Sequence, residues 1–206
     1  MSCDYQTLPE RLEIDNAEEQ LRDAVFVGRS NVGKSSLVNA VLGIEAAKTS
    51  KTPGKTRDLT YYPMERPYSR LIDCPGYGFA RASRQERERW RKLMEMYFAE
   101  SGTIQRVVFL VDMRAGLQDS DAMLMDMLVE NSLLFSLVLT KVDKVKSSHV
   151  RDKANSVIDE VKQKGFMGVC SPIVFLTSAY TSYGLPELKS GLVHALEQPK
   201  LLRTVR

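Results

Sequence analysis

The sequence predicts an α/β domain with a six-stranded, mostly parallel sheet that is covered by helices on both faces. Short apolar runs alternate with segments of helical periodicity along most of the 206 residues. The run 107–111 (VVFLV) is continuously apolar, as expected of a parallel strand buried on both faces. Polar motifs follow several of these runs, at the strand ends where open sheets of this class bind ligands.

The first expected elements surround the first two motifs. A buried strand at 24–27 leads into a helix at 35–42, and a polar loop covers 43–58. Two strands follow at 59–64 and 68–72. Helices and strands then alternate: a helix around 90–98, a strand at 107–111, a helix at 119–130, a strand at 133–139, a helix at 150–161, a strand at 173–176 and a helix at 185–196.

The length and composition predict one domain in a reducing compartment. We expect an N-terminal extension at 1–22, a single domain at 23–198 and a basic C-terminal tail at 199–206. The three cysteines lie far apart and form no metal-ligand spacing, which argues against disulfides and zinc. No apolar run reaches the length of a membrane span, so we expect no membrane partner. We also expect a monomer.

The charge of the chain is nearly balanced but unevenly distributed. Lysine and arginine total 29 against 26 acidic residues, which does not by itself indicate a nucleic-acid partner. The segment 81–92, however, has six basic residues and two acidic ones. This segment is either a solvated helix face or a contact surface for phosphate-rich RNA.

The motif GxxxxGK[ST] occupies residues 28–35, directly after the first strand and at the start of the next helix. Glycines there let the backbone curl so that its N–H groups point at phosphate oxygens, and the helix amino end favours negative charge. Lys34 is expected to reach the β- and γ-phosphates, and the Ser35 hydroxyl is expected to bind Mg²⁺. The expected fold class is therefore the P-loop NTPase.

A second motif, Asp73-Cys74-Pro75-Gly76, ends the strand at 68–72. Asp73 is expected to hold Mg²⁺ through a water molecule, and the Gly76 N–H to detect the γ-phosphate. In the loop between the two motifs, a threonine hydroxyl is needed to complete the magnesium shell when GTP is bound. Thr52, Thr56 and Thr60 are candidates, and Thr56 is favoured because Gly54 lets the loop fold over the nucleotide.

The third and fourth motifs predict a preference for guanine. Asp143, in Thr140-Lys141-Val142-Asp143, can accept hydrogen bonds from the guanine N1–H and amino group, which adenine does not match. The stem of Lys141 can lie across the ring, and Thr177-Ser178-Ala179 can present a backbone N–H to the guanine oxygen. The four motifs together predict a Ras-like G domain.

These motifs define the candidate site. Lys34, Thr56 and Gly76 are the expected catalytic residues, and Ser35, Thr56 and Asp73 the expected magnesium ligands. The residues expected to contact the nucleotide are Gly28, Arg29, Ser30, Asn31, Val32, Gly33, Lys34, Ser35, Ser36, Gly54, Lys55, Thr56, Arg57, Asp58, Asp73, Cys74, Pro75, Gly76, Thr140, Lys141, Asp143, Thr177, Ser178 and Ala179.

From about residue 24 to 197 the chain resembles the EngB group (also called YihA or YsxC) of the TRAFAC-class GTPases. The stretches that carry the resemblance are GRSNVGKSSLVNA, TSKTPGKTRD, DCPGYGFA followed by Trp90, VDMRAGLQDSD and TKVDK. The resemblance implies a GTPase that helps to assemble the large ribosomal subunit, with Ser35 and Thr56 as magnesium ligands. Related GTPases with asparagine at the position of Asn31 can hold K⁺, so K⁺ is a second expected ion.

Two residues depart from common patterns. Such proteins usually have leucine at the position of Cys74, and the cysteine here is expected to create a thiol beside the nucleotide that could be oxidisable. Tyr77 stands where many GTPases have a water-orienting glutamine, so intrinsic hydrolysis is expected to be slow. Arg57 and Arg81 could approach the phosphates, although an arginine in such loops is more often solvated or faces a partner.

The hypothesis that results is a slow GTPase that switches on GTP and GDP during assembly of the large ribosomal subunit. A bacterial-type cytoplasm is the expected location, or an organelle matrix if a transit peptide precedes the chain. The alternatives are a signalling or trafficking GTPase and a scaffold that holds GTP with little turnover. Missing lipidation signals count against the first, and Tyr77 keeps the second open.

Overall fold

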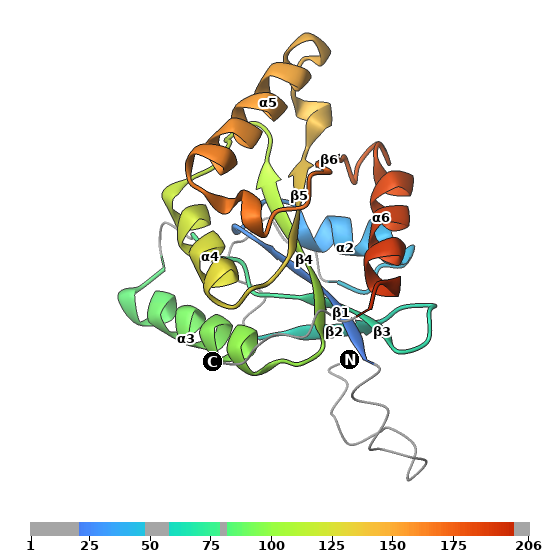
Figure 1. The fold of residues 1–206 in the computed structure, drawn as a ribbon. Helices are drawn as coiled ribbons and strands as arrows, with labels where there is room; N and C mark the ends of the chain where they lie inside the picture. The colour runs from blue at the N-terminus through green and yellow to red at the C-terminus, as the bar shows by residue number, and fades with distance from the viewer. Residues whose placement is uncertain (1–20, 48–57, 79–81, 200–206) are drawn as a thin grey trace.

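The computed structural model describes residues 21–47, 58–78 and 82–199, whose strands form one sheet in the order β2-β3-β1-β4-β5-β6 (Figure 1). All neighbouring strands run parallel except β2 and β3. The strands are β1 (Arg22–Gly28), β2 (Thr60–Pro63), β3 (Ser69–Asp73), β4 (Ile104–Asp112), β5 (Phe135–Thr140) and β6 (Phe175–Leu176). The helices are α2 (Lys34–Leu42), α3 (Arg84–Glu100), α4 (Asp119–Glu130), η1 (Val142–Lys144), α5 (Ser147–Gln163), η2 (Phe166–Gly168) and α6 (Leu185–Glu197).

Helices cover both faces of the sheet, as the sequence predicts (Figure 1). Side chains of α2 and α6 pack with Phe26 of β1 in one apolar core. Side chains of α3, α4 and α5 pack with Val25 and Val27 of the same strand in a second core. Successive residues of a strand point to opposite faces, so the continuous apolar run of β1 supplies both cores.

Besides β2, which is one residue shorter at each end than the expected 59–64, two strands begin two residues later than expected. Ser132 has φ 51°, and the Leu133 N–H bonds back to the Leu128 carbonyl at the end of α4, so β5 begins only at Phe135. The strand predicted at 173–176 reduces to Phe175–Leu176, and Ile173 is 61% exposed. These corrections concern strand ends and leave the topology unchanged.

Helix α3 begins before its apolar periodicity does. A capping box starts it, in which the Ser83 hydroxyl accepts from the Glu86 N–H and the Glu86 carboxylate accepts from the Ser83 N–H. The basic segment predicted at 81–92 therefore lies on this helix from Arg84 onwards, while the later Met94 and Phe98 are buried against the sheet.

The parallel strands bring the motif residues to one edge. Gly28, Asp73, Asp112 and Thr140 end β1, β3, β4 and β5, and Thr177 follows β6 directly. Of the predicted extension at 1–22, only residues 21 and 22 are described, and of the tail at 199–206 only Pro199. Among the described helices, none combines the length and apolarity needed to cross a bilayer.

Candidate functional site

The glycine motif forms a tight loop between β1 and α2. Gly33 has φ +103°, which L side chains rarely adopt, and the nearby Asn31 also has a positive φ of 65°. No side-chain cap occupies the amino end of α2, which leaves backbone N–H groups of the first helical turn without such a partner. This loop therefore offers N–H groups and a positive helix end to an anion such as phosphate.

Lys34, Ser35 and Asp73 meet at the base of this loop. The Lys34 Nζ lies 2.5 Å from Asp73 Oδ1, and the two side chains are 7% and 3% exposed. The Ser35 Oγ lies 3.5 Å from Asp73 Oδ2. Hydroxyl and carboxylate oxygens are ligands that Mg²⁺ prefers, so this pair fits the predicted magnesium site.

The Asp73–Gly76 segment lies directly against the phosphate loop. A Cβ on Gly76 would come within 3.0 Å of the Ser30 backbone and hydroxyl, so only glycine allows this approach. Cys74 corrects an expectation, because its side chain is 1% exposed within the apolar core that α3 and α4 cover. Burial raises the pKa of its thiol far above the usual value, which argues against the oxidisable thiol that the sequence predicts.

The Tyr77 hydroxyl is engaged in a buried hydrogen bond to α4. It donates to Asp121 Oδ1 on this helix over 2.7 Å, and both side chains are buried. The Tyr77 carbonyl accepts from the Ser30 N–H over 2.8 Å, and the Tyr77 ring lies 5.1 Å from that of Trp90. Tyr77 thus joins the phosphate loop to α3 and α4.

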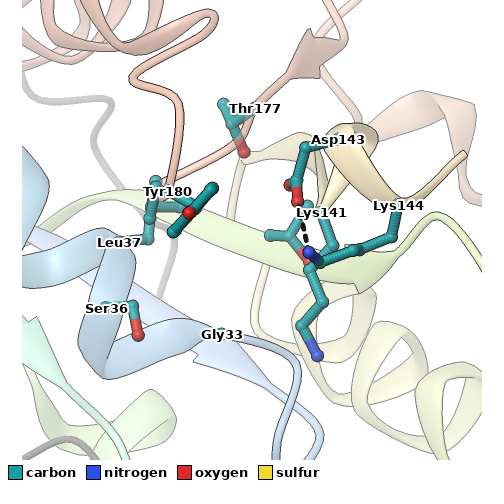
Figure 2. A pocket seen from close by; sticks show the side chains of 10 residues that line it. Gly33, Ser36, Leu37, Lys141, Asp143, Lys144, Thr177 and Tyr180 are labelled. Atoms are coloured by element: carbon teal, nitrogen blue, oxygen red, sulfur yellow. Dashed lines mark ion pairs between the residues drawn. The ribbon is translucent and has the colours of Figure 1, made fainter. Parts of the chain in front are cut away.

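The two guanine motifs surround a pocket of about 380 Å³ between α2 and the loops after β5 and β6. Figure 2 shows Lys141, Asp143 and Thr177 around this pocket. The Ser178 hydroxyl donates to Asp143 Oδ1 over 2.7 Å, and this bond lowers the pKa of Asp143. Asp143 is therefore held as a carboxylate, the form that accepts two hydrogen bonds from guanine.

Lys141 connects the base pocket to the phosphate loop. Its Nζ donates to the Asn31 carbonyl and pairs with Asp112 Oδ2 over 2.9 Å. Burial raises the pKa of Asp112, but hydrogen bonds from Arg114 and Lys141 outweigh burial and bring it to about 2. The Thr140 hydroxyl donates to the Val32 carbonyl over 2.7 Å and holds the same loop from the other side.

Several residues of the site were not predicted, among them Leu37 of α2, which lines the pocket. Tyr180 lines the pocket and is 86% exposed, and Lys144 Nζ lies 5.4 Å from its ring centroid. Asp112 ends β4, so the strand-end rule that located Asp73 also points to it. For Tyr180 the only signal in the sequence was its place directly after Ala179.

Most predicted site residues lie in these two clusters, and the exceptions fall in the loop between the first two motifs. Gly54, Lys55, Thr56 and Arg57 lie outside the described residues, as do Thr52 and Arg81. Asp58 is described and lies 3.8 Å from Arg89 on α3, with both side chains exposed. Thr60 stands opposite Asp73 in the β2–β3 ladder. The choice of Thr56 as a magnesium ligand stays a prediction.

Known proteins resemble this chain in both sequence and fold. The profile of a family described as 50S ribosome-binding GTPase matches residues 23–141. The probable GTP-binding protein EngB of Thermotoga petrophila is 43% identical over 81% of this chain and 82% of its own length. The chain belongs to the EngB family of GTPases.

Solved structures agree with this membership at the level of fold. A crystal structure of a probable EngB protein has a TM-score of 0.68 at 23% identity and covers 86% of this chain and 100% of that one. Era in complex with MgGDPNP and part of 16S ribosomal RNA has a TM-score of 0.67 at 21% identity, over 88% of this chain and 59% of that one. As an EngB-family GTPase, this protein binds GTP and GDP and hydrolyses GTP, and GTPases of this kind generally use Mg²⁺ with the nucleotide.

Proposed function

We propose that this protein is a GTP-controlled switch in the assembly of the large ribosomal subunit. In this proposal it binds the subunit or its precursor particles, through ribosomal RNA and proteins, in the GTP state and leaves after hydrolysis. The cytoplasm of a bacterial-type cell is the proposed location. One contact carries the proposal: the indole N–H of Trp90 on α3 donates to the Pro75 carbonyl over 2.8 Å.

This contact joins the nucleotide site to an outer helix. Pro75 precedes Gly76, whose N–H is predicted to detect the γ-phosphate, and the Trp90 ring also packs at a tilt against that of Tyr77. A change in the Asp73–Gly76 segment on GTP binding therefore acts directly on the first half of α3. Loops that the γ-phosphate orders and hydrolysis releases are the usual switch of such proteins.

The first half of α3 has the chemistry of an RNA contact. Residues 84–92 include five basic side chains and two acidic ones, and every residue there except Trp90 is exposed. The Glu86 carboxylate is engaged at the helix cap, whereas Arg84 and Lys92 have no ion-pair partner in the described part of the chain. Exposed basic groups on one helix bind phosphate backbones by releasing counterions.

Different residues of the site recognise the base, bind the phosphates and hold the magnesium ion. Asp143, held by Ser178, recognises guanine, and the phosphate loop and Lys34 bind and orient the phosphates. Ser35 and, through water, Asp73 would hold Mg²⁺, which supplies positive charge against the β- and γ-phosphates when bound. The buried position of Lys34 and Asp73 strengthens these interactions because little water screens them.

Potassium is proposed as a second ion at Asn31. The Asn31 backbone carbonyl accepts from Lys141, whereas its exposed side-chain amide has no hydrogen-bond partner among the described residues. This leaves a free oxygen ligand at the edge of the phosphate loop. GTP turnover is expected to be faster in KCl than in NaCl of equal ionic strength, and Asn31→Ala should abolish the difference. Equal rates of the unaltered protein in the two salts would refute the proposal.

Sedimentation with purified ribosomal subunits tests the proposed function. The protein should travel with the large subunit when it carries a non-hydrolysable GTP analogue and stay free with GDP. Arg84→Gln with Lys92→Gln should weaken this binding and reduce its salt dependence by about one to two counterions. The control, Lys164→Gln with Lys189→Gln, removes one charge from the carboxyl-terminal cap of α5 and one from α6 instead.

Trp90→Phe separates binding from switching. Phenylalanine keeps a ring against Tyr77 but cannot donate to Pro75, so the GTP and GDP states should differ less in subunit binding. If the unaltered protein stays free of both subunits in both states, the ribosomal role is wrong. If the unaltered protein binds, but the Arg84/Lys92 variant and the Lys164/Lys189 control weaken binding equally, α3 is not the contact surface.

A further inference from the structure

The hydroxyl of Ser30 is buried in the phosphate loop without a hydrogen-bond partner among the described residues. A hydroxyl can donate one hydrogen bond and accept two, and leaving it unpaired away from solvent costs free energy. The neighbouring backbone is well bonded, because the Ser30 N–H donates to the Tyr77 carbonyl over 2.8 Å. The unpaired hydroxyl thus lies in an ordered segment. A ligand that binds there reversibly would supply its hydrogen-bond partner.

The surroundings of this hydroxyl indicate which partner fits. Gly76 lies directly opposite, and a Cβ placed on it would be 3.0 Å from the Ser30 Oγ. Ser30 therefore lies where the phosphate loop comes closest to the Asp73–Gly76 segment. In P-loop GTPases the phosphate loop cradles the inner phosphates, and the second segment responds to the γ-phosphate. A donor between the two faces the third phosphate of GTP.

The neighbouring polar side chains Tyr77 and Lys34 have other partners. Tyr77, at the usual place of a water-orienting glutamine, is committed to Asp121. Of the two cations in the phosphate loop, Lys34 approaches from the Asp73 side and Arg29 lies beside Gly78. The two other buried polar atoms without partners in the described chain, Tyr97 Oη and Arg106 Nε, belong to α3 and β4 and not to the phosphate loop.

We propose that the Ser30 hydroxyl donates a hydrogen bond to the γ-phosphoryl group while it is transferred to water. In that reaction the water oxygen bonds to the γ-phosphorus and the bond to the β,γ-bridging oxygen breaks, with its electron pair going to GDP. The water proton passes to the released phosphate, and the serine is unchanged. A preorganised donor at an oxygen that gains charge stabilises the transition state. Ser30 is thus a catalytic residue of this GTPase in addition to those predicted.

Ser30→Ala tests the proposal because it removes one oxygen and keeps the Ser30 backbone that lies against Gly76. The turnover rate at saturating GTP should fall by about 10- to 100-fold, as for loss of a hydrogen bond to a charged group. The affinity for GDP, which lacks the γ-phosphate, should stay unchanged. Ser69→Ala is the control, since it also removes a buried hydroxyl but lies at the opposite end of β3.

Three measurements decide the result: single-turnover rates, equilibrium binding of GDP, and thermal unfolding with GDP bound. A lowered rate with unchanged GDP affinity and stability supports the proposal. An unchanged rate would overturn it, whatever the affinity for a GTP analogue. It would also be overturned if GDP binding weakened as much as turnover, since Ser30 would then only shape the loop.

Discussion

Replacing Tyr77 by phenylalanine removes a single hydroxyl from the link between the Asp73–Gly76 segment and α4. The Tyr77 and Asp121 side chains are 5% and 1% exposed, and their oxygens are 2.7 Å apart. Phenylalanine keeps the ring that packs 5.1 Å from Trp90, so the hydrogen bond is the main loss. Tyr97→Phe is the matched control, because the Tyr97 hydroxyl is also buried but has no partner in the described chain.

The expected free-energy change follows from the partners of Asp121. A hydrogen bond to a charged group contributes about 1.5–3 kcal/mol. Asp121 keeps the Gln118 N–H, which lies 2.8 Å from its Oδ2, so we expect a loss of about 2 kcal/mol in the free energy of unfolding. In a chain of this size that lowers Tm by about 4–8 °C. Tyr97→Phe should leave the free energy of unfolding unchanged or raise it by up to about 1 kcal/mol.

The cost of Tyr77→Phe should depend on pH. Burial raises the pKa of Asp121, and the hydrogen bond from Tyr77 opposes this rise without cancelling it. Because the folded-state pKa lies above the unfolded value, protonation of Asp121 favours the fold, and its contribution to stability improves as pH falls. Tyr77 stabilises the ionised form. The difference between variant and unaltered protein should therefore be largest at neutral pH and shrink towards about pH 4.

Urea unfolding at several pH values, with GDP kept at one saturating concentration, measures this difference. If Tyr77→Phe and Tyr97→Phe have the same stability at neutral pH, or if the cost of Tyr77→Phe grows as pH falls, the reasoning is wrong. GTP turnover of Tyr77→Phe should stay close to that of the unaltered protein, because the hydroxyl points to α4. A large loss of turnover would place the hydroxyl at the reacting water instead.

Three further predictions concern the base pocket and the core. Asp143→Asn should weaken GTP binding by about 100-fold and favour xanthosine triphosphate, because an amide donates where guanine also donates; unchanged GTP affinity in equilibrium binding would contradict this account. Tyr180→Ala should weaken GDP and inosine diphosphate by the same factor, about 5- to 100-fold, because stacking on a ring is insensitive to base identity. A loss confined to GDP would exclude stacking. Cys74 should escape thiol reagents in the folded protein and react in denaturant, since burial raises the pKa of its thiol; mass spectrometry after labelling checks this, and rapid labelling of the native protein would contradict it.

The local sequence pattern was enough to predict most helices and strands of the fold. The helix predicted at 119–130 matches α4 at both ends, and the apolar runs at 24–27 and 107–111 lie within β1 and β4. Period and apolarity are properties of neighbouring residues, so a single sequence reveals them. Strand ends were less accurate: β6 begins only at Phe175, and the Ile173 N–H before it donates to the Ser171 hydroxyl.

The sequence by itself determined the type of site and its location. The residues 28–35, Asp73 and Asp143 carry their chemistry in their own motifs, and the ends of parallel strands had to bring them to one edge of the sheet. Only the tertiary structure decided that Tyr77 turns to Asp121, that Trp90 bonds to Pro75 and that Cys74 is buried. These contacts depend on how α3 and α4 pack on the sheet. A motif fixes which groups are present, whereas the packing of distant segments fixes which of them remain free to meet a ligand.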